Sequence, residues 1–236
     1  MKALLLAAGF GTRLLPLTST TPKCLVPIGG KPLLQHWLER LAASRQFEEV
    51  IINTHYLAEE VDEFFSSYAP PIGINISYER KLLGPGGTLL RHRDQLASGD
   101  FLVAHADNFS LISWQEFLDA YHSRPDHCVG LMMTFESDDP SSCGIVQTDA
   151  QGIVTAMYEK VQSPPGRLAN AATFLFSPKV FEIIDRLDPA TVFDISQDII
   201  PSLCGHLATY ENTSYHRDIG TLKALSQARE DHGRMS

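Results

Sequence analysis

Residues 3–34 read ALLLAAGFGTRLLPLTSTTPKCLVPIGGKPLL, and this stretch decides how the chain begins to fold. The apolar run over residues 3–8 is typical of a buried strand, and Gly9 ends it. Gly9 and Gly11 permit a sharp turn that brings backbone N–H groups close to an anion. Arg13 adds a planar cation that can bind phosphate oxygens through two parallel hydrogen bonds. The stretch therefore predicts a strand followed by a phosphate-binding loop.

The loop differs from the two common glycine-rich nucleotide motifs. A dinucleotide-binding loop has a third glycine three residues after Gly11, where this chain has Leu14, and a P-loop has Gly-Lys followed by Ser or Thr. Lys23 follows Pro22 in a stiff segment and could fold back over the same phosphates. We therefore expect an anion site formed by the glycine turn and this lysine.

Strand-like and helix-like patterns alternate as far as residue 106. The periodicity predicts strands over residues 3–8, 50–52, 74–78 and 101–106, and helices over residues 33–41, 57–65 and 87–97. Three successive strand–helix–strand units predict a parallel sheet with helices on both faces. In such a sheet the ligand binds at the carboxyl ends of the strands, where the strand order reverses. The ends of the first and fourth strands, AAGFGTR and HADN, are therefore the expected site.

The pattern after residue 125 is less regular. Residues 127–135, 143–149, 153–160 and 172–178 have strand patterns, and residues 179–187, 195–203 and 221–232 have helical patterns. The turn over residues 149–152 suggests an antiparallel pair. We predict one α/β domain over residues 1–236, a Rossmann-like doubly wound mixed sheet with a small antiparallel extension.

Composition excludes several classes of protein. The 236 residues are 44% hydrophobic and 20% charged, which is typical of a globular domain and not of a disordered chain. The net charge of −9 disfavours nonspecific binding to nucleic acid. The apolar run at residues 3–8 is too short for a membrane span or signal peptide. The four cysteines form no C-x-x-C pair, which argues against a zinc site or disulfide framework and favours a reducing, cytoplasmic location.

A series of motifs resembles the sugar-1-phosphate nucleotidyltransferases. The motifs, in the order of that family, are LAAGFGTRLLPLT, TPKCLVPIGGKPLL, LGPGGTL, HADN, CGIV, YEKV, LANAATFLFSP and YHRDIGT. Much of the later sequence resembles the mannose- and heptose-1-phosphate guanylyltransferases. The resemblance implies transfer of a nucleotidyl group from a nucleoside triphosphate to a sugar 1-phosphate, with release of pyrophosphate and with Mg²⁺ as cofactor.

The resemblance also implies roles for individual residues. The nucleotide-binding residues would be Ala8, Gly9, Gly11, Thr12, Arg13, Lys23, Glu79, Gly84 and Gly87. The residues that bind the sugar phosphate would be Gly144, Glu159, Lys160 and Asn170. Asp107 and Asp218 match the two metal-binding aspartates, and Mg²⁺ prefers one or two carboxylates together with phosphate oxygens and water. The catalytic residues would be Arg13, Lys23, Asp107, Lys160 and Asp218.

Glu79 bears on the choice of base. Uridylyl- and thymidylyltransferases of the family commonly have Gln at the matching position, which meets the pyrimidine edge. A carboxylate only accepts hydrogen bonds, and guanine offers two adjacent donors, whereas uracil offers one donor between two acceptors. GTP is therefore favoured, and a uridylyl- or thymidylyltransferase acting on glucose 1-phosphate or another hexose 1-phosphate remains the alternative.

Three residues depart from the family pattern. Val161 follows Lys160 where Pro is usual and Ala172 occupies a position where Gly is common, which affects the details of the pocket more than the reaction. Ala106, where Gly is frequent, also resembles the choline-phosphate cytidylyltransferases, and a cytidylyltransferase of that type is a further alternative. A non-catalytic module that binds nucleotide sugars is a further alternative, disfavoured because Arg13, Lys23 and both aspartates are present. A nicotinamide oxidoreductase is disfavoured because no acidic residue follows the second strand.

The expected partners are a nucleoside triphosphate and a sugar 1-phosphate, without nucleic acid or membrane. Residues 1–110 would form the nucleotide-binding half and residues 111–236 the half that binds the sugar phosphate. The sequence is compatible with a homo-oligomer and identifies neither the oligomeric state nor the sugar.

Overall fold

The computed structural model describes residues 1–235, which form two compact units. The first unit contains residues 1–82, 104–111 and the chain from Tyr215 onward, and the second unit contains residues 83–103 and 112–214. This division follows the packing of the chain. The functional halves expected from the sequence, residues 1–110 and 111–236, are a different division and stay a prediction.

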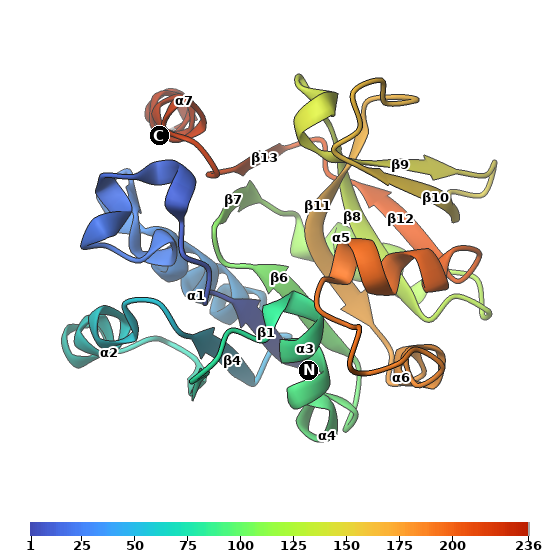
Figure 1. Ribbon diagram of the computed structural model, residues 1–236, viewed down its shortest axis with the longest axis horizontal. Coiled ribbons are helices and arrows are strands. Elements are labelled where there is room, and N and C mark those ends of the chain that lie inside the picture. The colour runs from blue at the N-terminus through green and yellow to red at the C-terminus, as the bar shows by residue number, and fades with distance from the viewer. Residues whose placement is uncertain (236) are drawn as a thin grey trace. The chain divides into compact units, whose positions relative to one another are not determined.

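The first unit is built on parallel strands that can be followed in Figure 1. Strand β1 (Lys2–Leu6) pairs in parallel with β4 (Glu49–Thr54), which pairs in parallel with β5 (Gly73–Tyr78). Strand β6 (Phe101–His105) enters the first unit at Ala104, and its end lies on the other side of β1, where the N–H of Ala106 donates to the carbonyl oxygen of Leu6 at 3.0 Å. The strand order therefore reverses between β1 and β6, and the predicted switch point is confirmed.

The helices of the first unit form where the sequence predicted them, although Leu57 precedes α2 with a left-handed backbone and does not belong to it. Helix α1 (Leu33–Ser44) buries the predicted apolar face, which consists of Leu33, Leu34, Trp37, Leu38 and Leu41. Helix α2 (Ala58–Ser67) buries Val61, and helix α7 (Leu222–Met235) buries Leu225 and Ala228. These helices bury one side each, as expected for amphipathic segments that cover a sheet or an adjoining core.

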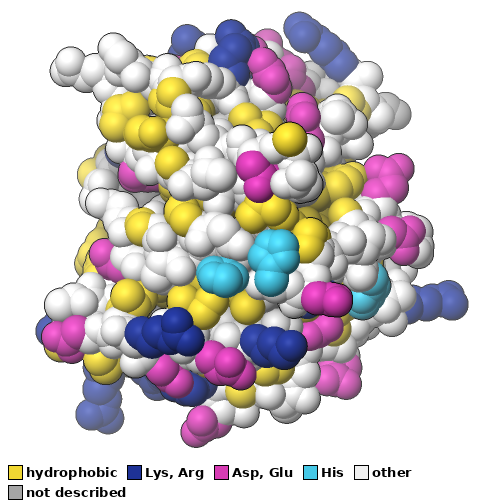
Figure 2. Space-filling model, turned by 90° about the vertical axis from the view of Figure 1, so that its right-hand side faces the viewer, with side chains coloured by type: hydrophobic (Ala, Val, Ile, Leu, Met, Phe, Trp, Pro, Cys, Tyr) yellow, Lys and Arg dark blue, Asp and Glu magenta, His cyan; other side chains and the backbone are white. Residues whose placement is uncertain are grey.

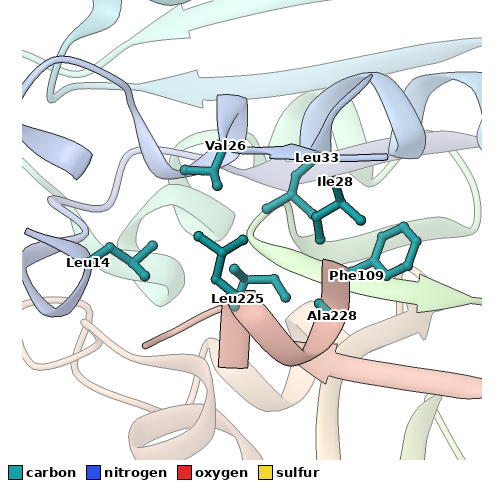
Figure 3. Close-up of a cluster of buried hydrophobic side chains, with 8 residues drawn as sticks. Leu14, Val26, Ile28, Leu33, Phe109, Leu225 and Ala228 are labelled. Carbon is teal, nitrogen blue, oxygen red and sulfur yellow. The ribbon is translucent and has the colours of Figure 1, made fainter. Parts of the chain in front are cut away.

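A hydrophobic cluster joins α7 to the loop that follows β1. Figure 3 shows Leu225 and Ala228 of α7 directed toward Leu14, Val26 and Phe109. Phe109 belongs to β7 (Asn108–Leu111), which pairs antiparallel with β13 (Tyr215–Asp218). The sequence patterns did not predict this two-stranded ribbon. A second short ribbon pairs β2 (Pro27–Ile28) with β3 (Lys31–Pro32).

The second unit contains a mixed set of strands. Strand β8 (Gly130–Glu136) pairs in parallel with β12 (Leu207–Glu211) and antiparallel with β11 (Leu168–Phe176). Strands β9 (Gly144–Thr148) and β10 (Val154–Glu159) form an antiparallel pair, and β9 also pairs antiparallel with β11. The antiparallel extension expected from the sequence is therefore confirmed, and β12 is an additional strand.

The helices of the second unit depart from the sequence-based expectation in four places. The helix predicted over residues 87–97 is divided at His92 into α3 (Gly84–Arg91) and α4 (Arg93–Leu96), because the backbone leaves helical angles there. Helix α5 (Trp114–His122) was not predicted, and α6 (Val180–Ile184) is shorter than expected. The segment 195–203 forms a π-helical turn and a 3₁₀ turn, where Pro201 has no N–H to continue a helix.

The charged surface is mixed in sign. Figure 2 shows Lys and Arg side chains interspersed with Asp and Glu over one face of the molecule. Ion pairs of the second unit include Arg93 with Asp185, and Arg167 with Glu136. Within residues 1–235, no helix has both the length and the apolar character needed to cross a membrane.

Candidate active site

The loop after β1 has the geometry of an anion-binding turn. Gly11 adopts a left-handed backbone with φ of 64°, and its carbonyl oxygen accepts from the Leu14 N–H at 2.9 Å and from Thr18 Oγ1 at 2.8 Å. A Cβ atom on Gly11 would lie 2.9 Å from the Thr18 methyl group, so glycine is required there. A Cβ on Gly9 would meet no described atom within 4 Å, so its exposed backbone is open to a ligand.

The neighbouring residues of the loop differ in exposure. Ala8 is buried with 4% of its surface exposed, whereas Thr12 and Arg13 are exposed. Thr12 and Arg13 begin a 3₁₀ turn that ends at Leu14. The loop therefore has an anchored base at Ala8 and Leu14, with a polar rim between them.

Lys23 lies between the two predicted metal-binding carboxylates. Its Nζ atom is 2.5 Å from Asp107 Oδ2 and 3.2 Å from Asp218 Oδ1. Lys23 starts a 3₁₀ turn after Pro22 and is only 7% exposed. The three residues come from distant parts of the chain, and the fold of the first unit brings them together, a contact that the sequence did not predict.

The charges of this group stabilise one another. Burial alone lowers the pKa of Lys23, but the Asp107 and Asp218 carboxylates outweigh it and hold that pKa above its ordinary value. Burial likewise raises the pKa of Asp107, but the Lys23 ammonium and His105 outweigh it and the pKa of that carboxyl is lowered. Both Lys23 and Asp107 are therefore charged near neutral pH. Adjacent Cys24 is fully buried, and burial raises the pKa of its thiol to about 12, so the thiol stays protonated.

Arg13 approaches the same group from the glycine loop. Its Nη2 atom is 3.9 Å from Asp218 Oδ2. A Cβ atom on Gly220 would lie 2.8 Å from each of these two atoms, so Gly220 makes the approach of Arg13 to Asp218 sterically permissible. Gly220 was not predicted as a site residue from the sequence, although the glycine of the DIGT motif was a signal for it.

Contacts from α1 and within the ribbon hold the two aspartates in register. Trp37 Nε1 donates to the Asn108 carbonyl oxygen at 2.9 Å, and the Arg40 guanidinium donates to the Ser110 carbonyl oxygen. Across the ribbon, Ser110 Oγ is 2.6 Å from His216 Nδ1. Burial lowers the pKa of His216 to about 3, so this imidazole is neutral. Because Asp107 precedes β7 and Asp218 ends β13, the ribbon fixes the spacing of their carboxylates.

Glu79 is fully buried at the end of β5. Its Oε1 atom accepts from Asn53 Nδ2 at 3.0 Å, while Asn53 Oδ1 accepts from the Ala7 N–H at 2.7 Å. His55 Nδ1 lies 2.7 Å from the Glu79 carbonyl oxygen. Asn53 thus links the ends of three neighbouring strands. It was not predicted from the sequence, because only acidic residues at the end of the second strand were taken as a signal there.

Gly84 and Gly87, the predicted nucleotide-binding glycines of the second unit, pack against residues 192–194. A Cβ on Gly84, which has φ of 74°, would clash with the Phe193 carbonyl oxygen and ring, and a Cβ on Gly87 would lie 3.8 Å from the Val192 carbonyl oxygen. Gly86, which was not selected from the sequence, donates its N–H to the Phe193 carbonyl oxygen at 2.8 Å. Close packing against residues 192–194 therefore explains why glycine is needed at positions 84 and 86.

Gly144, Glu159 and Lys160 meet at one end of the β9–β10 pair. Gly144 lies opposite Glu159 in the register, and a Cβ on Gly144 would lie 2.5 Å from Glu159 Oε2. Lys160 Nζ is 2.9 Å from Glu159 Oε1, with the lysine side chain 56% exposed. Glycine at position 144 thus leaves room for the Glu159 carboxylate.

Asn170 stabilises an irregular part of β11. Its Oδ1 atom accepts from the Ala172 N–H at 2.8 Å, and its Nδ2 atom is 3.3 Å from Ser196 Oγ. Ala172 has a left-handed backbone with φ of 48°, and the pairing of β11 with β8 shifts register between Asn170 and Phe174. The position where the family commonly has glycine is thus one that favours glycine, and this chain has alanine there.

The carboxylate pair fits a magnesium ion better than a metal that needs an all-protein cage. Asp107 Oδ1 is buried and has no hydrogen-bond partner among residues 1–235, so this carboxylate oxygen lacks a protein donor and is suited to a cation. No cluster of three or more His, Cys, Asp or Glu side chains that could hold a metal occurs in the described chain. Two carboxylates with water and phosphate oxygens are a usual magnesium environment.

Comparison with known proteins identifies the family of the chain. A family model described as nucleotidyl transferase matches residues 2–234. The chain belongs to this family. The structure of the chain also resembles the crystal structure of a Bacillus anthracis protein assigned as a glucose-1-phosphate thymidylyltransferase. The TM-score is 0.86 and the identity 23%, with coverage of 98% of this chain and 95% of that one. This likeness confirms the predicted mixed α/β fold.

Two curated relatives are similar in sequence. The chain is 32% identical over 226 residues to the mannose-1-phosphate guanylyltransferase of Mycobacterium tuberculosis, covering 93% of this chain and 61% of that protein. It is 30% identical over 229 residues to the mannose-1-phosphate guanylyltransferase catalytic subunit beta of Dictyostelium discoideum, covering 94% and 62%. The chain therefore spans less than two thirds of the length of these relatives.

Proposed function

We propose that this protein transfers a nucleotidyl group from a nucleoside triphosphate, with GTP favoured, to a mannose- or heptose-like sugar 1-phosphate. The observation that carries the proposal is the meeting of Lys23 with Asp107 and Asp218 in the unit that also holds the Gly9–Arg13 loop. Membership of the nucleotidyl transferase family and the names of the curated relatives support it.

The reaction explains why cations and carboxylates are needed together. An oxygen of the sugar phosphate attacks the α-phosphorus of the triphosphate, and the new O–P bond forms as the bond to the leaving pyrophosphate breaks. Mutual repulsion of the two anions opposes this approach. Arg13 and Lys23 would offset the charge of the triphosphate, while the exposed backbone at Gly9 would bind phosphate oxygens. Mg²⁺ held by Asp107 and Asp218 would neutralise and orient the phosphates.

The second unit would bind the acceptor. Lys160 would pair with the phosphate of the sugar 1-phosphate, and Glu159 would accept hydrogen bonds from sugar hydroxyl groups. Gly144 would keep the space beside Glu159 open, and Asn170 would preserve the irregular β11 backbone near Ser196. The ion pair between Glu159 and Lys160 supports this division because it holds both polar groups at the same strand end.

We assign the choice of base to Glu79 and the end of β5. In the described state Asn53 binds its carboxylate, so contact with guanine requires Glu79 to adjust its hydrogen bonds. The donors of guanine would then replace or share those of Asn53. The names of the two guanylyltransferase relatives favour the same base.

We also infer a cytoplasmic location. Cys24, Cys128, Cys143 and Cys204 carry free thiols, which suits a reducing compartment. Fractionation of the cells that make the protein, with detection by antibody, tests this inference.

The activity is tested by mixing the protein with Mg²⁺, each of the four ribonucleoside triphosphates and dTTP in turn, and a panel of hexose and heptose 1-phosphates. Pyrophosphate release should be fastest with GTP and should require the sugar phosphate. Release with UTP or dTTP and glucose 1-phosphate would support the alternative substrates. A protein that binds nucleotide sugar but releases no pyrophosphate with any pair would be a binding module.

A further inference from the structure

Lys23 stands at the point where the two acidic side chains converge. Its ammonium group contacts one oxygen of Asp107 and one oxygen of Asp218, and its side chain is 9% exposed. A Mg²⁺ ion that took either of these two oxygens as a ligand would have to displace the ammonium group from it. The lysine and the metal would therefore compete for the same carboxylates.

We propose that Lys23 is the resident counter-ion of the Asp107–Asp218 pair in the nucleotide-free protein, and that it exchanges these carboxylates for the triphosphate when metal and nucleotide bind. The inference rests on the proposed nucleotidyl transfer for the identity of the metal and of the anion. The new element is that binding of the metal and binding of the nucleotide are coupled through Lys23. A metal ion that binds alone must displace the buried Lys23 ammonium, which then has no anionic partner. When nucleotide binds with the metal, its phosphates become the new partner of the ammonium.

The position of the Lys23 stem supports this exchange. A Cβ atom on Gly11 would lie 3.4 Å from the Cβ of Lys23, so the lysine side chain starts beside the anion-binding loop. Rotation of the flexible stem can therefore redirect the ammonium while the backbone remains in its 3₁₀ turn. The backbone itself is held by the N–H groups of Leu25 and Val26, which donate to the Pro22 and Lys23 carbonyl oxygens at 2.8 and 3.2 Å.

Electrostatics favour a resident cation when nucleotide is absent. Without Lys23, two carboxylates would face each other at a partly buried position, with side-chain exposures of 27% for Asp107 and 53% for Asp218. Like charges in such surroundings repel, and a buried charge without a partner is unfavourable. Arg13 does not replace Lys23, because it lies 3.9 Å from Asp218 and its side chain is 60% exposed.

The decisive experiment measures metal binding without nucleotide. Mn²⁺ serves as the probe, and electron paramagnetic resonance reports the free ion during titration of the wild type and of Lys23→Met. Removal of the competing ammonium should tighten Mn²⁺ binding by about tenfold or more, within the usual range of coupling between ligands. Lys31→Met is the matched control, because it removes the same charge from an exposed lysine that pairs with Glu39. Its Mn²⁺ affinity should change less than about threefold, as for a screened surface charge.

A second readout protects the test against a variant that folds poorly. Lys23→Gln removes the charge but retains hydrogen-bond donors, and it should show the same gain in Mn²⁺ affinity. Thermal unfolding of both variants should begin at a lower temperature than in wild type without metal, and Mn²⁺ should raise it by more than in wild type.

The outcomes separate this inference from the proposed function. If the wild type binds Mn²⁺ as tightly as both Lys23 variants, the proposed exchange is wrong. This holds even if the wild type releases pyrophosphate from GTP and a sugar 1-phosphate. The opposite result is also informative. If the Lys23 variants gain Mn²⁺ affinity but the wild type releases no pyrophosphate, the role of Lys23 as counter-ion is supported and the proposed function is wrong.

Discussion

In the first unit Lys23 meets carboxylates that are 84 and 195 positions away in the chain, whereas in the second unit Lys160 meets the carboxylate of its neighbour Glu159. The first lysine is almost completely buried, and the second is more than half exposed. A buried group assembled by topology is sensitive to the loss of any member, because the remaining charges lose their partners. An exposed pair at a strand end is screened by water and can change partners at little cost.

The largest expected effect comes from the carboxylates of the first unit. Asp107→Asn or Asp218→Asn should lower turnover by at least about a hundredfold, the scale of a lost transition-state electrostatic contact. Steady-state pyrophosphate release at saturating Mg²⁺ measures the effect. Asp62→Asn, at an exposed position of α2, is the control and should keep wild-type turnover. Near wild-type turnover in both site variants would remove Asp107 and Asp218 from the active site.

The two lysines should fail in different ways. Lys23→Ala should lower kcat/KM for the triphosphate by about a hundredfold, because it removes a desolvated cation next to the phosphates. Lys160→Ala should mainly raise the KM for the sugar phosphate, by about tenfold for the loss of one charge-assisted contact.

Initial rates with each substrate varied in turn measure both effects. Lys179→Ala, which removes an exposed lysine of the second unit, should leave both KM values unchanged. If Lys23 and Lys160 variants show one common pattern, the assignment of separate substrates to the two lysines is wrong.

Substitution of Glu79 tests whether a buried carboxylate of the first unit also determines which base is bound. Wild type should prefer GTP over UTP and dTTP by about ten- to a hundredfold in kcat/KM, the cost of mispairing a buried charged acceptor. Glu79→Gln adds a donor and should narrow that ratio. A purely structural role at the Asn53 contact predicts another result: the melting temperature falls while the ratio of GTP to UTP use stays constant.

The sequence predicted the parallel strands and α1 well, because their burial imposes long, regular apolar patterns. The β7–β13 ribbon was missed since each strand has only four residues and β13 carries the charged sequence YHRD. Helix α5 was missed although Trp114, Phe117, Leu118 and Tyr121 have helical spacing, which was a readable signal.

Some residues of the candidate site could be predicted from the sequence and others could not. The sequence selected Lys23, Asp107 and Asp218 as site residues because their side-chain chemistry is distinctive, and the structure brings the three side chains together. The sequence could not identify Asn53 or Gly220, whose roles depend on the distance between strand ends and on the space beside Arg13. Nor could spacing alone show that Lys23 would contact both aspartates, since that contact needs the ribbon register and the 3₁₀ turn.

Ala172 offers the smallest expected effect and concerns the backbone of the second unit. Its φ of 48° is left-handed, a conformation that costs an L-residue about 1–2 kcal/mol relative to right-handed backbone. Ala172→Gly removes this strain, but the greater freedom of glycine in the unfolded chain cancels about 0.5–1 kcal/mol of the gain. The net result should be an increase of up to about 1 kcal/mol in the free energy of unfolding, measured by urea denaturation. Ala171→Gly is the adjacent control without a left-handed φ and should destabilise the protein. Equal destabilisation by both substitutions would show that the left-handed backbone at Ala172 stores no strain that glycine can release.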